Sequence, residues 1–154
     1  MKQIMCLLSV LVLLFSIASC AILEDRQSQV LETLGDYETK RFWTDGGIQD
    51  YTDFGIYTYQ SVNLEGNEYF KKLSDDTVDA FLMFIDDFEG WVELIGTTSP
   101  ESELAKNYSF DRALIDAKDY FYIYEDEDYN KFGCYDLWFF DSQTNTLYYF
   151  HSNT

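Results

Sequence analysis

The chain is poor in the residues that many functional sites need. Its 154 residues include one proline, one histidine and three cysteines, and only 10 Lys and Arg stand against 28 Asp and Glu. A formal charge of -18 repels phosphate backbones, so the sequence predicts no nucleic-acid partner. One histidine and no paired Cys or His spacing exclude the common structural zinc sites. No glycine-rich phosphate loop or dinucleotide fingerprint is present, so we expect no cofactor and no metal.

The shortage of histidine also restricts catalysis, because His151 is the only imidazole. If Asp141 pairs with Thr146 in a hairpin, Asp136 lies across from His151 as an orienting carboxylate. Cys134 is on the same strand face as Asp136, but a lone cysteine between apolar strands is more often buried and inert. The sequence therefore offers no nucleophile. We predict no catalytic residues and no enzyme, with an unusual hydrolase as the alternative.

The N-terminus carries the clearest pattern in the chain. Lys2 is the only charged residue before Glu24, and residues 4–18 are apolar apart from two serines. A basic residue, an apolar run and small residues at its end are typical of a secretory signal peptide. The alternative is an uncleaved membrane anchor.

The end of this run resembles the lipobox of bacterial lipoproteins. The match is Ile17-Ala18-Ser19-Cys20: an aliphatic residue, two small residues and a cysteine. The resemblance implies cleavage between Ser19 and Cys20, a diacylglycerol on the Cys20 sulfur, and a signal peptide over residues 1–19. Two acyl chains, at about 0.8 kcal/mol per buried methylene, hold a domain stably on a membrane. Residues 20–154 would then form one extracytoplasmic domain anchored to the bacterial cell membrane. The rival interpretation is ordinary cleavage after Ala21 and release as a secreted protein.

The remainder has the composition of one folded domain. The chain is 47% hydrophobic and 19% aromatic, which suffices for a single core without disulfides. The lipobox resemblance also implies that no disulfide forms within the mature domain, because Cys6 would leave with the signal and Cys20 would be acylated, so that Cys134 would remain alone. Beyond its signal, the chain resembles only uncharacterised small bacterial lipoproteins.

Apolar spacing predicts two helices. The first spans residues 22–37, with Gly35 as a C-terminal cap. The second follows the N-cap candidate Ser74, with apolar side chains from Val78 to Phe88 on one face, and ends at Gly90 or within residues 96–100.

Aromatic and β-branched runs predict the strands. Residues 54–62 and 68–73 are expected to form a hairpin, and residues 120–124, 134–140 and 147–151 a three-stranded meander. The fold class is therefore α+β: an antiparallel sheet of about five strands, with a C-terminal meander, packed against two helices. We expect the helices to cover one face and the other face to be rich in tyrosine.

Tyrosine and tryptophan supply contact area at low entropic cost and are enriched at binding hot spots. The leading hypothesis is therefore a non-catalytic binding module for a protein or envelope component. Its alternative is a carbohydrate-binding or substrate-capturing accessory lipoprotein, in which Trp43 or Trp91 stacks on sugar rings. The same aromatics can instead simply fill the core. The candidate binding residues are Trp43, Trp91, Tyr122, Tyr124 and Tyr148.

Overall fold

A computed structural model describes residues 26–47, 50–125 and 134–153. The chain divides into two compact units, residues 1–36 and residues 37–154. In the first unit the described residues include a helix over 26–32, which is followed by Gly35 in the left-handed region (φ 80°). A glycine with positive φ just beyond a helix is a common C-terminal cap, as the sequence predicts. The expected signal peptide, Ser19 and Cys20 lie outside the described residues.

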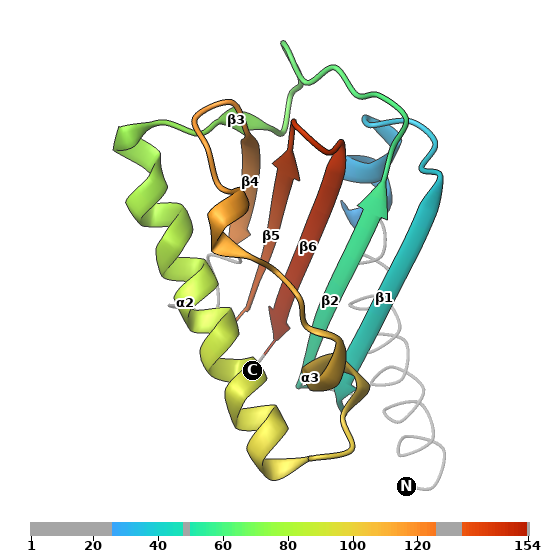
Figure 1. The fold of residues 1–154 in the computed structure, drawn as a ribbon, viewed down its shortest axis with the longest axis vertical. Coiled ribbons are helices and arrows are strands. Elements are labelled where there is room, and N and C mark those ends of the chain that lie inside the picture. The colour runs from blue at the N-terminus through green and yellow to red at the C-terminus, as the bar shows by residue number, and fades with distance from the viewer. Residues whose placement is uncertain (1–25, 48–49, 126–133, 154) are drawn as a thin grey trace, which may run out of the picture. The chain divides into compact units, whose positions relative to one another are not determined.

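The second unit is built on a six-stranded antiparallel sheet with the order β1-β2-β6-β5-β4-β3 (Figure 1). Its strands are β1 (Thr39–Gly46), β2 (Tyr51–Thr58), β3 (Lys71–Lys72), β4 (Tyr120–Glu125), β5 (Cys134–Asp141) and β6 (Thr146–Asn153). The C-terminal strand β6 lies between β2 and β5, so it joins the N-terminal hairpin to the C-terminal meander.

Helices α2 (Asp75–Thr98) and α3 (Glu103–Asn107) lie on one side of this sheet (Figure 1). Acidic Asp75 and Asp76 occupy the first turn of α2, where a carboxylate interacts favourably with the helix dipole. The backbone N–H of Ser74 donates to the Thr77 hydroxyl at 3.0 Å, which satisfies one free donor at the helix start. A 3₁₀ turn, η1 (Arg112–Leu114), is tied to α2 by an ion pair between Arg112 and Asp86.

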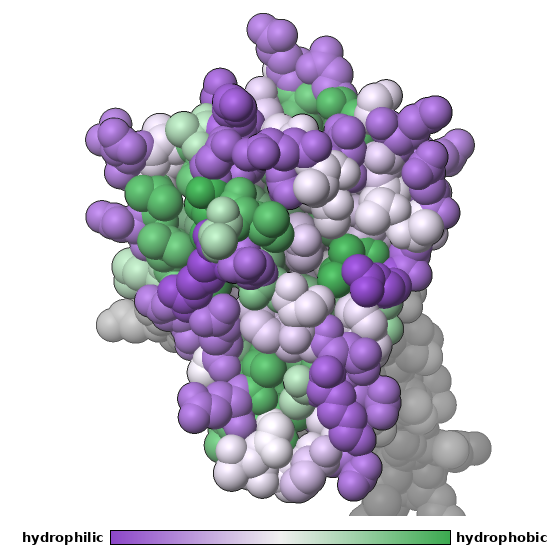
Figure 2. Space-filling model, in the orientation of Figure 1, coloured by the Kyte–Doolittle hydropathy of each residue, from purple (hydrophilic) through white to green (hydrophobic). Residues whose placement is uncertain are grey.

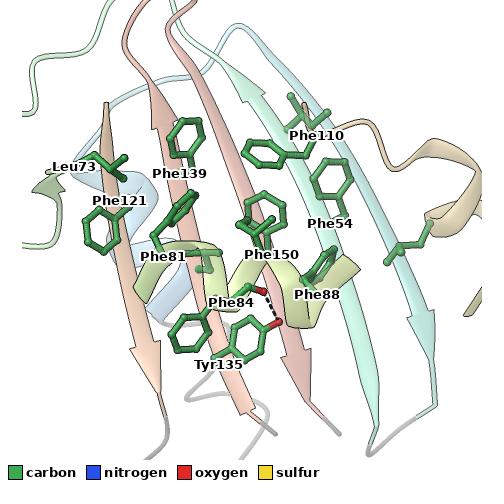
Figure 3. Packing of buried hydrophobic residues seen from close by; sticks show 14 residues of the cluster. Phe54, Leu73, Phe81, Phe84, Phe88, Phe110, Phe121, Tyr135, Phe139 and Phe150 are labelled. Atoms are coloured by element: carbon green, nitrogen blue, oxygen red, sulfur yellow. Dashed lines mark hydrogen bonds between the residues drawn. The ribbon is translucent and has the colours of Figure 1, made fainter. Parts of the chain in front are cut away.

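The core fills the space between α2 and the sheet. Figure 3 shows phenylalanines of α2 packed against rings from the central strands. Ring centroids lie 5.3 Å apart for Phe81 and Phe139, and 5.2 Å apart for Phe88 and Phe150. Burying each such side chain stabilises the fold by about 1.5–3 kcal/mol. Figure 2 shows the molecular surface in the orientation of Figure 1, where the visible apolar side chains form separate patches divided by hydrophilic residues.

The structure confirms the predicted α+β class, with an antiparallel sheet packed against helices. It also confirms the C-terminal meander, because β4, β5 and β6 are consecutive neighbours. The sheet has six strands rather than about five. The predicted hairpin between residues 54–62 and 68–73 is wrong, since β2 pairs with β1 and β6, and β3 pairs with β4. Strand β1 is missing from the prediction because its polar sequence resembles a loop.

The second predicted helix is confirmed and is longer than its apolar run. It continues through Gly90 and Gly96 to Thr98, so an end at Gly90 is wrong. A helix tolerates an internal glycine at a cost of about 1 kcal/mol when packing supports it. Trp91 is part of this helix and is half-buried. None of the helices in the described part of the chain is long and apolar enough to span a membrane.

Candidate functional site

The sheet face turned away from α2, here called the second face, carries two parallel rows of side chains. The strand registers place Thr44, Asp53, His151, Asp136 and Tyr124 side by side on five neighbouring strands. We call this set the polar row. The adjacent aromatic row holds Phe42, Gly55, Tyr149, Trp138 and Tyr122 at equivalent positions. Side chains of neighbouring strands at equivalent positions interact directly, so each row acts as a unit.

Asp136 organises the centre of the polar row. Its Oδ1 accepts a hydrogen bond from the Tyr149 hydroxyl at 2.6 Å and lies 2.8 Å from Nδ1 of His151. Because a carboxylate only accepts hydrogen bonds, Nδ1 carries the proton and Nε2 presents a lone pair when the ring is neutral. Asp136 and His151 are each 3% exposed. The predicted register, with Asp141 opposite Thr146 and Asp136 opposite His151, is confirmed.

Several buried polar atoms on this face have no hydrogen-bond partner. Within the described ranges they are Asp53 Oδ1, His151 Nε2 and Trp138 Nε1, which lie on neighbouring strands, and Tyr59 Oη, which lies beyond the opposite end of β2. Asp53 faces His151 across the β2–β6 pair, and Trp138 follows Asp136 on the same strand face. An unsatisfied buried polar group costs free energy, so several close together often mark a functional site or internal water.

Burial also controls the charge of Asp53. Desolvation raises the pKa of this carboxyl above its usual 3.8, and a side-chain hydrogen bond from Thr44 and the proximity of His151 offset only part of that rise. Burial likewise raises the pKa of the Tyr149 phenol, and the neighbouring Asp136 carboxylate raises it further. Tyr149 therefore stays protonated and acts as a hydrogen-bond donor.

The aromatic row forms a continuous stack across the sheet. Ring centroids are 6.1 Å apart for Phe42 and Tyr149, 5.2 Å for Tyr149 and Trp138, and 5.0 Å for Trp138 and Tyr122. Gly55 makes this packing possible, because an added Cβ would lie 3.0 Å from Phe42 Cδ2. The glycine leaves room for Phe42 to lie across β2 and reach Tyr149.

The aromatic row ends in a group of half-buried tyrosines at the β4 side of the sheet. Tyr120, Tyr122 and Tyr124 alternate along β4 and share the second face, and the Tyr69 ring lies 5.3 Å from that of Tyr122. We call these four residues the tyrosine strip. Trp138, which is 0% exposed, stacks behind Tyr122 and holds it in place. Exposed Lys72 of β3 pairs with Tyr120 and lies beside the strip.

The structure brings together only two of the five predicted binding residues. Tyr122 and Tyr124 belong to the tyrosine strip. Trp43 and Tyr148 are half-buried on the helix-covered face, where Trp43 stacks on Phe54 at 5.8 Å. Trp91 is on α2. The two tryptophans expected to stack on sugars therefore lie on different elements, Trp43 on β1 and Trp91 on α2.

Sequence reasoning missed Tyr69, Tyr120 and Asp53 as members of these sites. Alternation along residues 120–124 places Tyr120 on the same face as Tyr122, so that signal was present. Asp53 was missed because the predicted strand begins at Phe54. Tyr69 lies in the connection between β2 and β3, and no local pattern predicts its contact with Tyr122.

The chemistry available on the second face is limited. Cys134 Sγ donates to the Asn153 side-chain oxygen at 2.7 Å, and His151 makes its hydrogen bond to Asp136 instead. Over the described ranges no three His, Cys, Asp or Glu side chains are grouped to hold a metal ion. The acidic connection at 126–130 lies outside those ranges. Comparison with family models, curated proteins and solved structures found no match to the chain.

Proposed function

We propose that the protein is a lipid-anchored, extracytoplasmic binding module that contacts a protein or another envelope component through the tyrosine strip, without catalysing a reaction. The anchor is supported by the lipobox resemblance that ends at Cys20. The binding role is supported by one observation above all: consecutive side chains of β4 on the second face are half-buried tyrosines backed by the buried Trp138.

This arrangement suits recognition for an energetic reason. A free tyrosine loses rotamer freedom when a partner orders it, and that loss opposes binding. Stacking against Trp138 and Tyr69 already restricts the Tyr122 ring, so less entropy remains to be lost. The phenol hydroxyl and ring then offer a hydrogen bond and apolar area together, the combination that is enriched at interface hot spots.

Site-specific photo-crosslinking in the producing cells tests the binding surface. A benzophenone amino acid replaces Tyr124 or Tyr120 in separate variants, and Leu94 of α2, which is 48% exposed, serves as the matched control. We expect the same discrete adduct from both tyrosine positions and none from Leu94. Equal crosslinking from all three positions, or none from the tyrosines, contradicts the proposed surface.

Intact-protein mass spectrometry of membrane and medium fractions tests the anchor. A diacylglycerol-modified chain beginning at Cys20 is expected in the membrane fraction, and it should disappear in Cys20→Ala while remaining in Cys134→Ala. An unmodified chain beginning at Ile22 in the medium overturns the anchor and leaves the binding surface to be tested separately.

The His151–Asp136 pair supports a second candidate function, hydrolysis by general-base catalysis. In this scheme a water molecule donates its proton to His151 Nε2 as its oxygen attacks the substrate, and Asp136 stabilises the imidazolium. The test is turnover of p-nitrophenyl esters by the wild type and by His151→Gln, with Asn153→Ala as the control. Equal rates for the wild type and His151→Gln exclude this role.

A further inference from the structure

The two edges of the sheet differ in how well they are protected against pairing with another strand. Edge strand β3 has two residues, both lysines, and short charged strands discourage further pairing. Edge strand β1 has eight residues, contains no proline, and pairs with β2 in an unbroken register from Thr39 to Gly46. Such a strand offers a full-length surface for another strand.

The backbone groups that face outward on β1 follow from the hydrogen-bond pattern. Gly47 N–H donates to the Asp50 carbonyl at 2.8 Å, and antiparallel pairs alternate between bonded and non-bonded. Thr39, Arg41, Trp43 and Asp45 therefore bond to β2, which turns the N–H and C=O groups of Lys40, Phe42, Thr44 and Gly46 outward. Throughout the described ranges these outward groups make no backbone hydrogen bond.

Two charges on β1 are also without an ion-pair partner in the described part of the protein. Arg41 and Asp45 are four residues apart on the same strand face, and neither belongs to any of the salt bridges there. Arg41 instead lies 6.0 Å from the Trp43 ring centroid. Arg41 precedes Trp43 by two residues and Asp45 follows it by two. In an antiparallel pair of two such strands centred on Trp43, each arginine therefore lies opposite an aspartate.

We propose that β1 pairs with β1 of a second copy of this chain, joining two six-stranded sheets across a two-fold axis at Trp43. In this register Arg41 of each copy lies opposite Asp45 of the other, and Phe42 exchanges backbone hydrogen bonds with Thr44. If one strand slides by two residues so that the two-fold axis lies at Phe42, Arg41 lies opposite Trp43. If the strand slides by two residues in the other direction, the axis lies at Thr44 and Trp43 lies opposite Asp45. Only the register centred on Trp43 pairs both charges.

The proposal is tested by charge reversal in the purified protein, with mass in solution measured by light scattering after size exclusion. The wild type is expected to be dimeric. Arg41→Asp and Asp45→Arg each create two like-charge contacts, so each variant alone should be monomeric. Mixing the two variants pairs opposite charges at both positions and should restore a dimer. The double variant, R41D with D45R, should dimerise with itself.

The matched control is Lys71→Asp on the opposite edge strand, which should leave the dimer intact. Circular dichroism of each variant verifies folding, and the recovery on mixing requires folded chains in any case. A monomeric wild type overturns the proposal. A dimer that persists in Arg41→Asp places the interface elsewhere, and single variants that do not combine exclude this register.

Discussion

Asp119 shows how one buried carboxyl can hold several chain segments together. It is 0% exposed, its Oδ1 accepts from Ser142 N at 2.9 Å, and its Oδ2 accepts from Asp116 N at 2.8 Å. The first bond reaches the turn between β5 and β6, and the second closes the turn before β4. Desolvation raises the pKa of this carboxyl, while the two backbone hydrogen bonds act in the opposite direction. The two hydrogen bonds offset part of the free-energy cost of burying the carboxyl group.

Asp119→Ala is therefore expected to destabilise the protein substantially. The substitution leaves two backbone N–H groups without their acceptor, at a cost of about 1–3 kcal/mol each where water cannot replace it. Urea denaturation followed by tryptophan fluorescence measures the loss. Asp111→Ala is the control, because Asp111 is exposed and accepts a single local hydrogen bond from Ala113 N. Equal losses from the two variants contradict the role assigned to Asp119.

Asp53 predicts a pH dependence of stability whose sign follows from its burial. Its pKa is raised in the folded protein, so the native state keeps this proton to a higher pH than the unfolded chain. Stability from this group is present at low pH and is lost as pH rises from the usual 3.8 through the folded pKa. Asp53→Asn removes the ionisation while keeping the side-chain shape.

We therefore expect Asp53→Asn to be more stable than the wild type at neutral pH, with the difference shrinking as pH falls toward 4. Melting temperatures measured across this range provide the test, and Asp50→Asn, at an exposed position, controls for the general loss of charge. A variant less stable than the wild type at neutral pH shows that the carboxylate has a stabilising partner instead.

Two glycines in different elements have opposite packing constraints. A Cβ at Gly55 of β2 would lie 3.0 Å from Phe42 Cδ2 and 3.0 Å from Tyr57 Cε2, whereas a Cβ at Gly90 of α2 meets no atom within 4 Å. Overpacking costs about 1–3 kcal/mol, and alanine is favoured over glycine in a helix by about 0.5–1 kcal/mol. Gly55→Ala should lower the urea midpoint and Gly90→Ala should raise it. A stabilising Gly55→Ala contradicts the tight aromatic row.

Among the helices and strands, the local sequence pattern predicted an element correctly where its apolar residues recur with a regular spacing or form a continuous run. The α2 stripe from Val78 to Phe88 was predictable because its apolar residues face the core. The three C-terminal strands were predictable because each is a run rich in aromatic residues. Strand β1 was not predictable, because five of its eight residues are exposed at a sheet edge and the exposed positions do not alternate with buried ones. The predicted hairpin was wrong because adjacent strands were assumed to pair, although the segment before α2 contributes only Lys71 and Lys72 to the sheet.

The charge of the whole molecule predicts how its stability responds to salt. A formal charge of -18 on 154 residues produces self-repulsion in the compact state, which is relieved on unfolding. The Debye length falls from about 30 Å at 0.01 M to about 3 Å at 1 M, so added salt screens this repulsion. The urea midpoint should rise with sodium chloride over that range. A falling midpoint means that attractive ion pairs dominate.

The local sequence determined the acidic balance, the α2 helix and the C-terminal meander with its Asp136–His151 register. These features depend on residues close together in the chain, where periodicity, capping and turn formation act. Tertiary structure alone decided that β6 inserts beside β2 and that β1 forms the far edge. Those pairings bring Asp53 to His151 and Phe42 to Tyr149 from distant parts of the sequence. The second face exists only once these segments pack together, because no local pattern specifies which strands become neighbours.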